Sequence, residues 1–130
     1  MIRFNGNYIS DFVAIDIETS GLDAEHDFVI KVMAMKVKED VGIGKFSSFV
    51  SCPEKLSTAV VELTGISDAD LEHAPTLGAV MEQFELFREG LPLVAYNAPF
   101  IEKFVRKVGN YTIGDISKEE IIEIAKGEIL

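Results

Sequence analysis

The chain of 130 residues is 48% hydrophobic and 26% charged, which is typical of a soluble globular protein and predicts one domain over residues 1–130. Its 12 basic and 22 acidic residues leave a net charge of −10, which argues against the broad basic surface that binding to duplex nucleic acid requires. The sequence has no apolar run long enough to span a membrane, no signal-peptide layout and a single cysteine, so we expect a cytoplasmic protein without a membrane partner.

The first half of the chain predicts three antiparallel strands. Apolar residues recur at every second position over residues 11–19, which indicates a strand with one polar face. A second strand is expected at Val29–Lys38, where β-branched residues and methionines dominate. Gly42 and Gly44 indicate a hairpin, and residues 45–51 predict the third strand.

The second half of the chain predicts helices and one further strand. The expected helices are marked by amphipathic spacing or capping residues: Thr58–Thr64 closed by Gly65, a short helix from Ser67, residues 77–87, residues 97–109 capped by Asn97, and a helix opened by Ser117 with Glu120. Residues 92–96 are apolar and predict a buried strand parallel to the first. The expected class is therefore α/β, with a mixed sheet of three antiparallel strands and then a parallel strand, and flanking helices.

Asp16 and Glu18 are the first candidates for chemistry. They are two residues apart on a predicted strand, so both carboxylates should point to one face. Carboxylate oxygens are ligands for Mg²⁺ and Mn²⁺, and such a pair could hold one ion or bridge two. The alternative is that the two residues only form the solvated face of a strand.

Three segments, in order along the chain, carry a resemblance to a known family. Residues 16–22 resemble the motif D-x-E-T-T/S-G-L, and residues 93–100 are similar to V-A-H-N-A-x-F-D. Residues 61–67, with the Ala74-Pro75 pair after them, look like the segment between those motifs. On these motifs the chain resembles the DEDD 3′–5′ exonucleases, a ribonuclease H-like family that includes the proofreading (epsilon) subunit of DNA polymerase III and the exonuclease domain of Gram-positive replicative polymerases. The resemblance covers residues 11–105.

The resemblance implies a two-metal mechanism with Mg²⁺ or Mn²⁺, acting on the 3′ end of single-stranded DNA or RNA. Asp16 and Glu18 match the first two of four carboxylates, so they would be catalytic residues and metal ligands. Five other positions match those that contact or shape the substrate site in the family: Thr19, Gly21, Leu22, Asn97 and Phe100.

The sequence departs from the family pattern at the remaining positions. Ile101 stands where the third carboxylate should follow Phe100, and Tyr96 replaces a histidine. The fourth carboxylate motif has no candidate, and the strand and long helix that carry it are not predicted, as in a C-terminally truncated domain. Glu102 is adjacent to the lost position but points about 100° away on a helix. Lys31 occupies a position that is acidic in many relatives.

These departures leave three hypotheses. The chain is an exonuclease-family protein with impaired or lost catalysis, or a non-catalytic binding module on an exonuclease fold, or a shortened copy of a longer enzyme. A missing strand would leave an open sheet edge, which would favour a homodimer or a replication or repair protein as partner. His26 and His73 lie in polar stretches and are expected at the surface. Residues 116–130 match no family segment.

Overall fold

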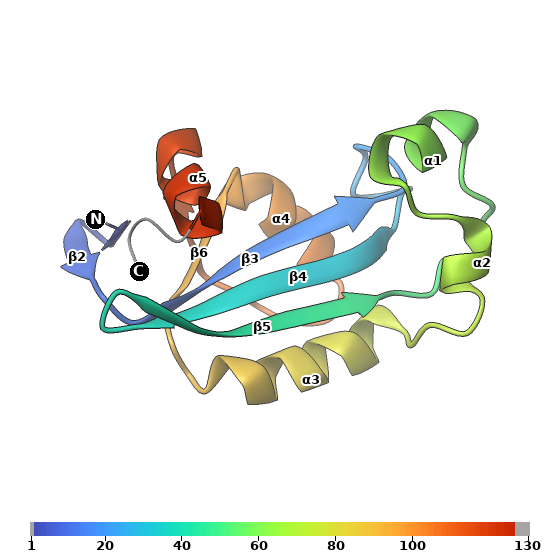
Figure 1. Ribbon diagram of the computed structural model, residues 1–130. Helices are drawn as coiled ribbons and strands as arrows, with labels where there is room; N and C mark the ends of the chain where they lie inside the picture. The colour runs from blue at the N-terminus through green and yellow to red at the C-terminus, as the bar shows by residue number, and fades with distance from the viewer. Residues whose placement is uncertain (1, 127–130) are drawn as a thin grey trace.

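The computed structural model of the chain describes residues 2–126. Its centre is a five-stranded sheet in the order β5-β4-β3-β6-β7, drawn in Figure 1. The first three strands along the chain are antiparallel: β3 (Phe12–Thr19), β4 (Val29–Lys38) and β5 (Val41–Phe49). The last two, β6 (Leu93–Tyr96) and β7 (Ile113–Ile116), run parallel to β3. The predicted mixed α/β sheet is therefore confirmed.

Helices cover the sheet on both sides (Figure 1). The helices are α1 (Thr58–Thr64), α2 (Asp68–Leu71), α3 (Leu77–Arg88), α4 (Ala98–Val105) and α5 (Lys118–Lys126). Side chains of α3 and α4 pack on one face, while α5 and the hairpin of β1 (Ile2–Phe4) and β2 (Asn7–Ile9) cover part of the other. Within residues 2–126, no helix has the length and apolar character needed to cross a membrane.

The alternation on β3 divides its side chains between two cores. Val13, Ile15 and Ile17 are buried in the larger core beneath α3 and α4. Ala14 points to the opposite face and joins a second core with α5 and the hairpin. Because successive side chains of a strand alternate, Asp16 and Glu18 share the face of Ala14. Asp16 lies at the border of the part of that face that α5 covers, since both line one hollow.

The turn between β4 and β5 differs from the prediction. The hairpin turns at Glu39 and Asp40, whose φ angles of 52° and 62° are both positive. The two central residues of a tight hairpin turn commonly have this conformation. The Asp11 carboxylate accepts a hydrogen bond from the Glu39 amide at 2.8 Å and helps to fix the turn. Gly42 and Gly44, predicted at the turn, instead lie within β5.

Strand β7 was not predicted, and it forms the fifth strand of the sheet. It contains Gly114 and Asp115 between two isoleucines, so its sequence gives only a weak strand signal. Its pairing with β6 extends over all four residues of each strand. The expectation of a sheet that ends without this strand is therefore wrong, and the edge strand on this side is β7 rather than β6.

The capping predictions are confirmed at α1, α2 and α5 but not at α4. Asn97 precedes α4 in a left-handed conformation and its side chain forms no capping hydrogen bond. The carboxylate of Asp115 on β7 instead accepts the Ala98 amide at 3.0 Å. The helix ends at Val105, earlier than the predicted Gly109.

Candidate functional site

Asp16 and Glu18 lie on an open face of the sheet, as predicted. In the antiparallel ladder Glu18 is directly opposite Lys31, and Asp16 is directly opposite Met33. We call this surface the carboxylate face, and its side chains come from three strands: Ala14, Asp16, Glu18, Lys31, Met33, Met35, Lys45, Ser47 and Phe49. Figure 1 shows this face open between α5 and α1.

The environment of the carboxylate pair opposes ionisation of both groups. Partial burial raises the pKa of Asp16, although its backbone hydrogen bond from the Ile17 amide, at 2.8 Å, works in the other direction. The Asp16 side chain reaches water, so its burial is incomplete. Partial burial and then the charge of Asp16 raise the pKa of Glu18, while the Lys31 ammonium acts to lower it. A cation held between the carboxylates would relieve both costs.

A hollow of ≈ 230 Å³ adjoins Asp16. Its walls are mainly apolar and come from the sheet and from α5, including Met33, Met35, Ile121 and Ile124, with Lys45 at its side. The isoleucines belong to the predicted helix that matched no family segment. The sequence did not reveal that this helix returns to the face of Asp16.

The second motif does not supply a third carboxylate. Ile101 is 2% exposed and packs in the larger core, which agrees with the apolar helix face expected from the sequence. Glu102 cannot replace it, because its carboxylate accepts the Ile113 amide of β7 at 3.0 Å. Tyr96, in the place of the family histidine, is 49% exposed. These positions of the second motif therefore add no free carboxylate to Asp16 and Glu18.

The last residue of β3 and the loop after it contain three of the predicted substrate-binding residues. The Thr19 hydroxyl donates a hydrogen bond to the Gly21 carbonyl at 2.6 Å and shapes the turn. A Cβ atom at Gly21 would overlap the Asp27 carboxylate, so a larger residue here would displace the acceptor of the Asp23 amide hydrogen bond. Leu22 is 86% exposed. The loop therefore presents an apolar side chain on a tightly built turn.

The other two predicted substrate-binding residues lie at the start of α4. Asn97 is exposed, and Phe100 is half-buried with its ring centroid 5.0 Å from that of Phe104. The parallel ladder between β3 and β6 would hold this segment beside Asp16, but it ends after Ala14 and Val94. Beyond that point β3 and β6 do not pair with each other. The structure brings neither residue into the hollow beside Asp16.

Leu22 lies beside basic residues that the sequence analysis missed. A second hollow, of ≈ 600 Å³, is lined by Leu22, Asp23, Ala24, Glu25, Lys103, Arg106 and Lys107. Lys107 donates a hydrogen bond to the Asp27 carbonyl at 2.9 Å across 80 residues of sequence. The three basic residues at positions 103–107 were a possible signal, but their position beside this loop depends on the fold.

The donor atoms of the carboxylate face suit one hard cation. Asp16 and Glu18 can supply two oxygens for one hard cation, which completes its shell with water or substrate oxygens. Ile101 is apolar and Lys31 is positively charged, so neither adds a ligand for a second ion. The one group of three potential ligands within residues 2–126 is Asp23, Glu25 and His26, on an exposed loop.

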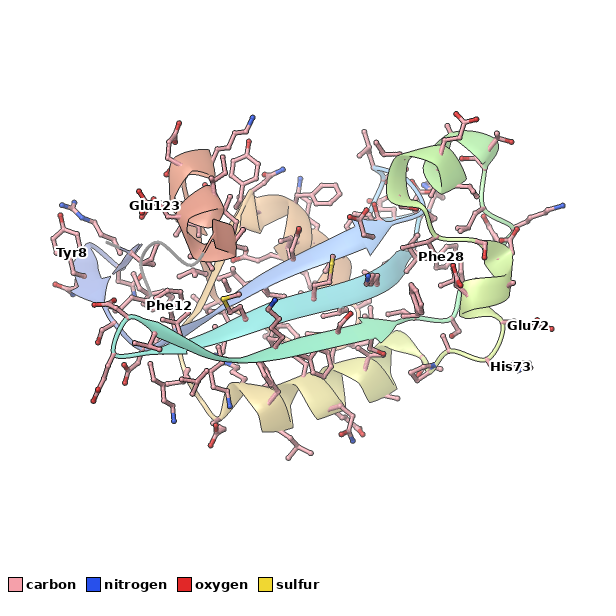
Figure 2. All side chains as sticks on the ribbon, in the orientation of Figure 1. Tyr8, Phe12, Phe28, Glu72, His73 and Glu123 are labelled. Carbon is pink, nitrogen blue, oxygen red and sulfur yellow. The ribbon has the colours of Figure 1, made fainter. Side chains whose placement is uncertain are left out.

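The histidines are exposed, as expected. The Nδ1 atom of His26 is 2.7 Å from an Asp23 carboxylate oxygen, and this contact raises the pKa of His26. Figure 2 shows His73 projecting from the segment after α2, at the edge of the molecule. Neither histidine shares a hollow with Asp16.

Comparison with known proteins decides the family. The family model described as RNase_T, Exonuclease, matches residues 13–110. The chain belongs to this exonuclease family. The predicted membership of the DEDD 3′–5′ exonucleases is thereby confirmed, and so is the ribonuclease H-like fold.

The relatives agree with the family assignment, and the solved structures agree with the fold. The PolC-type DNA polymerase III of Bacillus cereus is 42% identical over 94 residues, which cover 72% of this chain and 7% of that protein. The Bacillus subtilis protein is 33% identical over 117 residues, or 90% of this chain and 8% of its own length. Exonuclease I superposes with a TM-score of 0.69 at 16% identity, covering 89% of this chain and 31% of that one. Exonuclease X gives 0.66 at 18% identity, covering 87% and 63%. The chain thus spans less than a tenth of these polymerases.

Proposed function

We propose that this exonuclease domain binds the 3′ end of single-stranded nucleic acid at Asp16 and Glu18, and that its hydrolytic activity is impaired or lost. The observation that supports the loss is the burial of Ile101 in the core, where the family has a carboxylate. Two carboxylates on an open face remain available for a metal. Binding therefore requires fewer groups than hydrolysis does, and it can persist without the reaction.

Asp16 and Glu18 would hold a single Mg²⁺ or Mn²⁺ ion. Such an ion, when bound, polarises phosphate oxygens and offsets their charge. The two side chains would orient it on the carboxylate face, with the hollow beside Asp16 next to it. Neither His26 nor His73 lies in the hollow beside Asp16, where it could accept a proton from water. We therefore expect slow hydrolysis at most.

The proposed ligand is a single strand, because the net charge of −10 allows only a small contact with phosphates. The Escherichia coli exonuclease I structure similar to this chain is a complex with a dA16 oligonucleotide. The polymerase relatives favour DNA over RNA and a cytoplasmic replication protein as partner. In this proposal Thr19, Gly21 and Leu22 line the path of the terminal nucleotide, and Asn97 and Phe100 form its far side.

The test uses labelled single-stranded DNA and RNA oligonucleotides with Mn²⁺, Asp16→Ala and a chelator control. We expect binding in anisotropy measurements and little or no shortening on denaturing gels. Fast, metal-dependent shortening that Asp16→Ala abolishes would contradict the loss of catalysis. A folded protein that binds neither oligonucleotide would contradict the proposed ligand.

A second candidate is a non-catalytic module that binds another protein. The observation in its favour is β5, an edge strand of the sheet whose Val41 and Ile43 are 50% and 53% exposed. Edge strands with apolar side chains tend to pair with other chains. A second copy would make a homodimer, which light scattering over a wide concentration range detects. A monomer at every concentration would count against the homodimer.

A further inference from the structure

Lys31 is the positive group nearest to the carboxylate pair in the β3–β4 ladder. It lies directly opposite Glu18, and the Cβ atoms of such cross-strand neighbours are about 5 Å apart. Both side chains project from the carboxylate face. Lys31 is half-buried, so its ammonium group remains within reach of a ligand on that face.

The Lys31 side chain is positioned by packing rather than by an ion pair. Its Nζ atom lies 5.4 Å from the centroid of the Phe49 ring, which is its neighbour on β5. The ion pairs found within residues 2–126 join His26 to Asp23, Lys36 to Glu89 and Arg88 to Glu85, and none of them includes Lys31. An ammonium group carries three donors, so donors on Lys31 remain for a ligand.

A fixed charge here affects a metal and a phosphate in opposite ways. It repels a divalent cation held by Glu18, because two like charges a few ångströms apart repel even in water. It attracts a phosphate oxygen, for which lysine is a common partner. The buried Ile101 points to the same result, because it removes the ligand that a second ion would need.

We propose that Lys31 takes the place of the second cation and binds a phosphate oxygen of the nucleic acid. The inference rests on the proposed function and adds a specific residue to it. The site then contains at most one metal ion, at Asp16 and Glu18, and one permanent positive group from the protein. Nucleic acid binding consequently depends less on the metal than in a site built for two ions.

The test compares Lys31→Met with Lys38→Met in the full chain. Methionine keeps an unbranched apolar stem against Phe49 and removes the charge. Lys38 is a suitable control because it is also half-buried and lies at the opposite end of β4. The two variants have the same net charge, since each loses one lysine. Mn²⁺ affinity is measured by calorimetry, and oligothymidylate affinity by anisotropy in EDTA at several salt concentrations.

We expect Lys31→Met to tighten Mn²⁺ binding by about 3- to 10-fold and to weaken oligonucleotide binding by a similar factor. The slope of log affinity against log salt should fall by about 0.7, the value for one phosphate contact of a single strand. Lys31→Arg should keep oligonucleotide binding close to wild type. Lys38→Met should change both affinities by less than about twofold.

The inference is overturned if Lys31→Met and Lys38→Met, both folded by circular dichroism, give the same two affinities. If the wild type binds oligonucleotide and Lys31→Met does not weaken it, Lys31 is excluded while the proposed function stands. If the wild type binds no oligonucleotide, the proposed function fails. In that case the Mn²⁺ measurement alone tests the role of Lys31. The inference is overturned if Lys31→Met does not bind Mn²⁺ more tightly than the wild type.

Discussion

The last residues of β3 and the first turn of α4 belong to the two matched motifs of one family site, and their side chains face different surroundings. Asp16 and Glu18 lie on an open face, where strand alternation keeps them apart from the core. Ile101 is 2% exposed and packs against the core residues of α4 and β3. The comparison shows that the strand can keep its carboxylates without cost to packing. At the helix position, an apolar residue contributes to the core.

The largest expected effect comes from restoring the family residue at the helix position. Ile101→Asp places a charge in the core and removes apolar contacts, so we expect a loss of about 3–5 kcal/mol in the free energy of unfolding. Urea denaturation measures this loss, with Ile101→Val as a control at about 1 kcal/mol. Wild-type stability together with tighter Mn²⁺ binding in Ile101→Asp would show that the helix position still belongs to the metal site.

The next largest effect is expected at Asp16 on β3, and it concerns metal binding rather than stability. Asp16→Ala should weaken Mn²⁺ binding at least about tenfold, because one of two protein ligands is lost. Calorimetry measures the change, and Asp11→Ala provides a control with the same charge at a turn away from the face. Equal Mn²⁺ affinities for the two variants would mean that the ion binds elsewhere, for instance at the Asp23 loop.

The carboxylate of Asp115 on β7 caps the start of α4, and its removal tests how firmly this helix is held. Asp115→Ala removes the side-chain acceptor for the Ala98 amide, and we expect a loss of about 1 kcal/mol in stability. Asp115→Asn keeps an acceptor oxygen and should retain most of the stability. Thermal unfolding checks both. No loss in the alanine variant would show that water can satisfy the start of α4.

The smallest effect concerns the protonation of the strand carboxylates. Partial burial raises the pKa of both Asp16 and Glu18, so protons compete with the metal at a higher pH than for ordinary carboxylates. Mn²⁺ affinity should fall as pH is lowered through that raised pKa. A raised pKa in the folded state also means that the ionised form costs stability above it. Asp16→Asn should therefore stabilise the fold at pH 7, by no more than about 0.5 kcal/mol because the group reaches water.

The sequence was sufficient where the deciding signals are local. Val29–Lys38 and Thr58–Thr64 have the bounds predicted from β-branched residues and caps, and the shared face of Asp16 and Glu18 follows from strand alternation. Contacts between distant segments were not predictable in this way. The basic residues beside Leu22 and the cap from Asp115 both join segments that are separated in the chain. Pattern and spacing do not determine which of these segments meet.

Two hydrogen bonds join α4 and β7 in opposite directions: Asp115 accepts from α4, and Glu102 on α4 accepts from β7. A rotation of α4 that brought Glu102 towards the metal site would break both links together. Recruiting Glu102 by rotating this helix would therefore cost two hydrogen bonds at once. A substitution at position 101 would leave both hydrogen bonds in place. From any isoleucine codon, an aspartate requires at least two nucleotide changes, and the resulting protein would be less stable before it was more active.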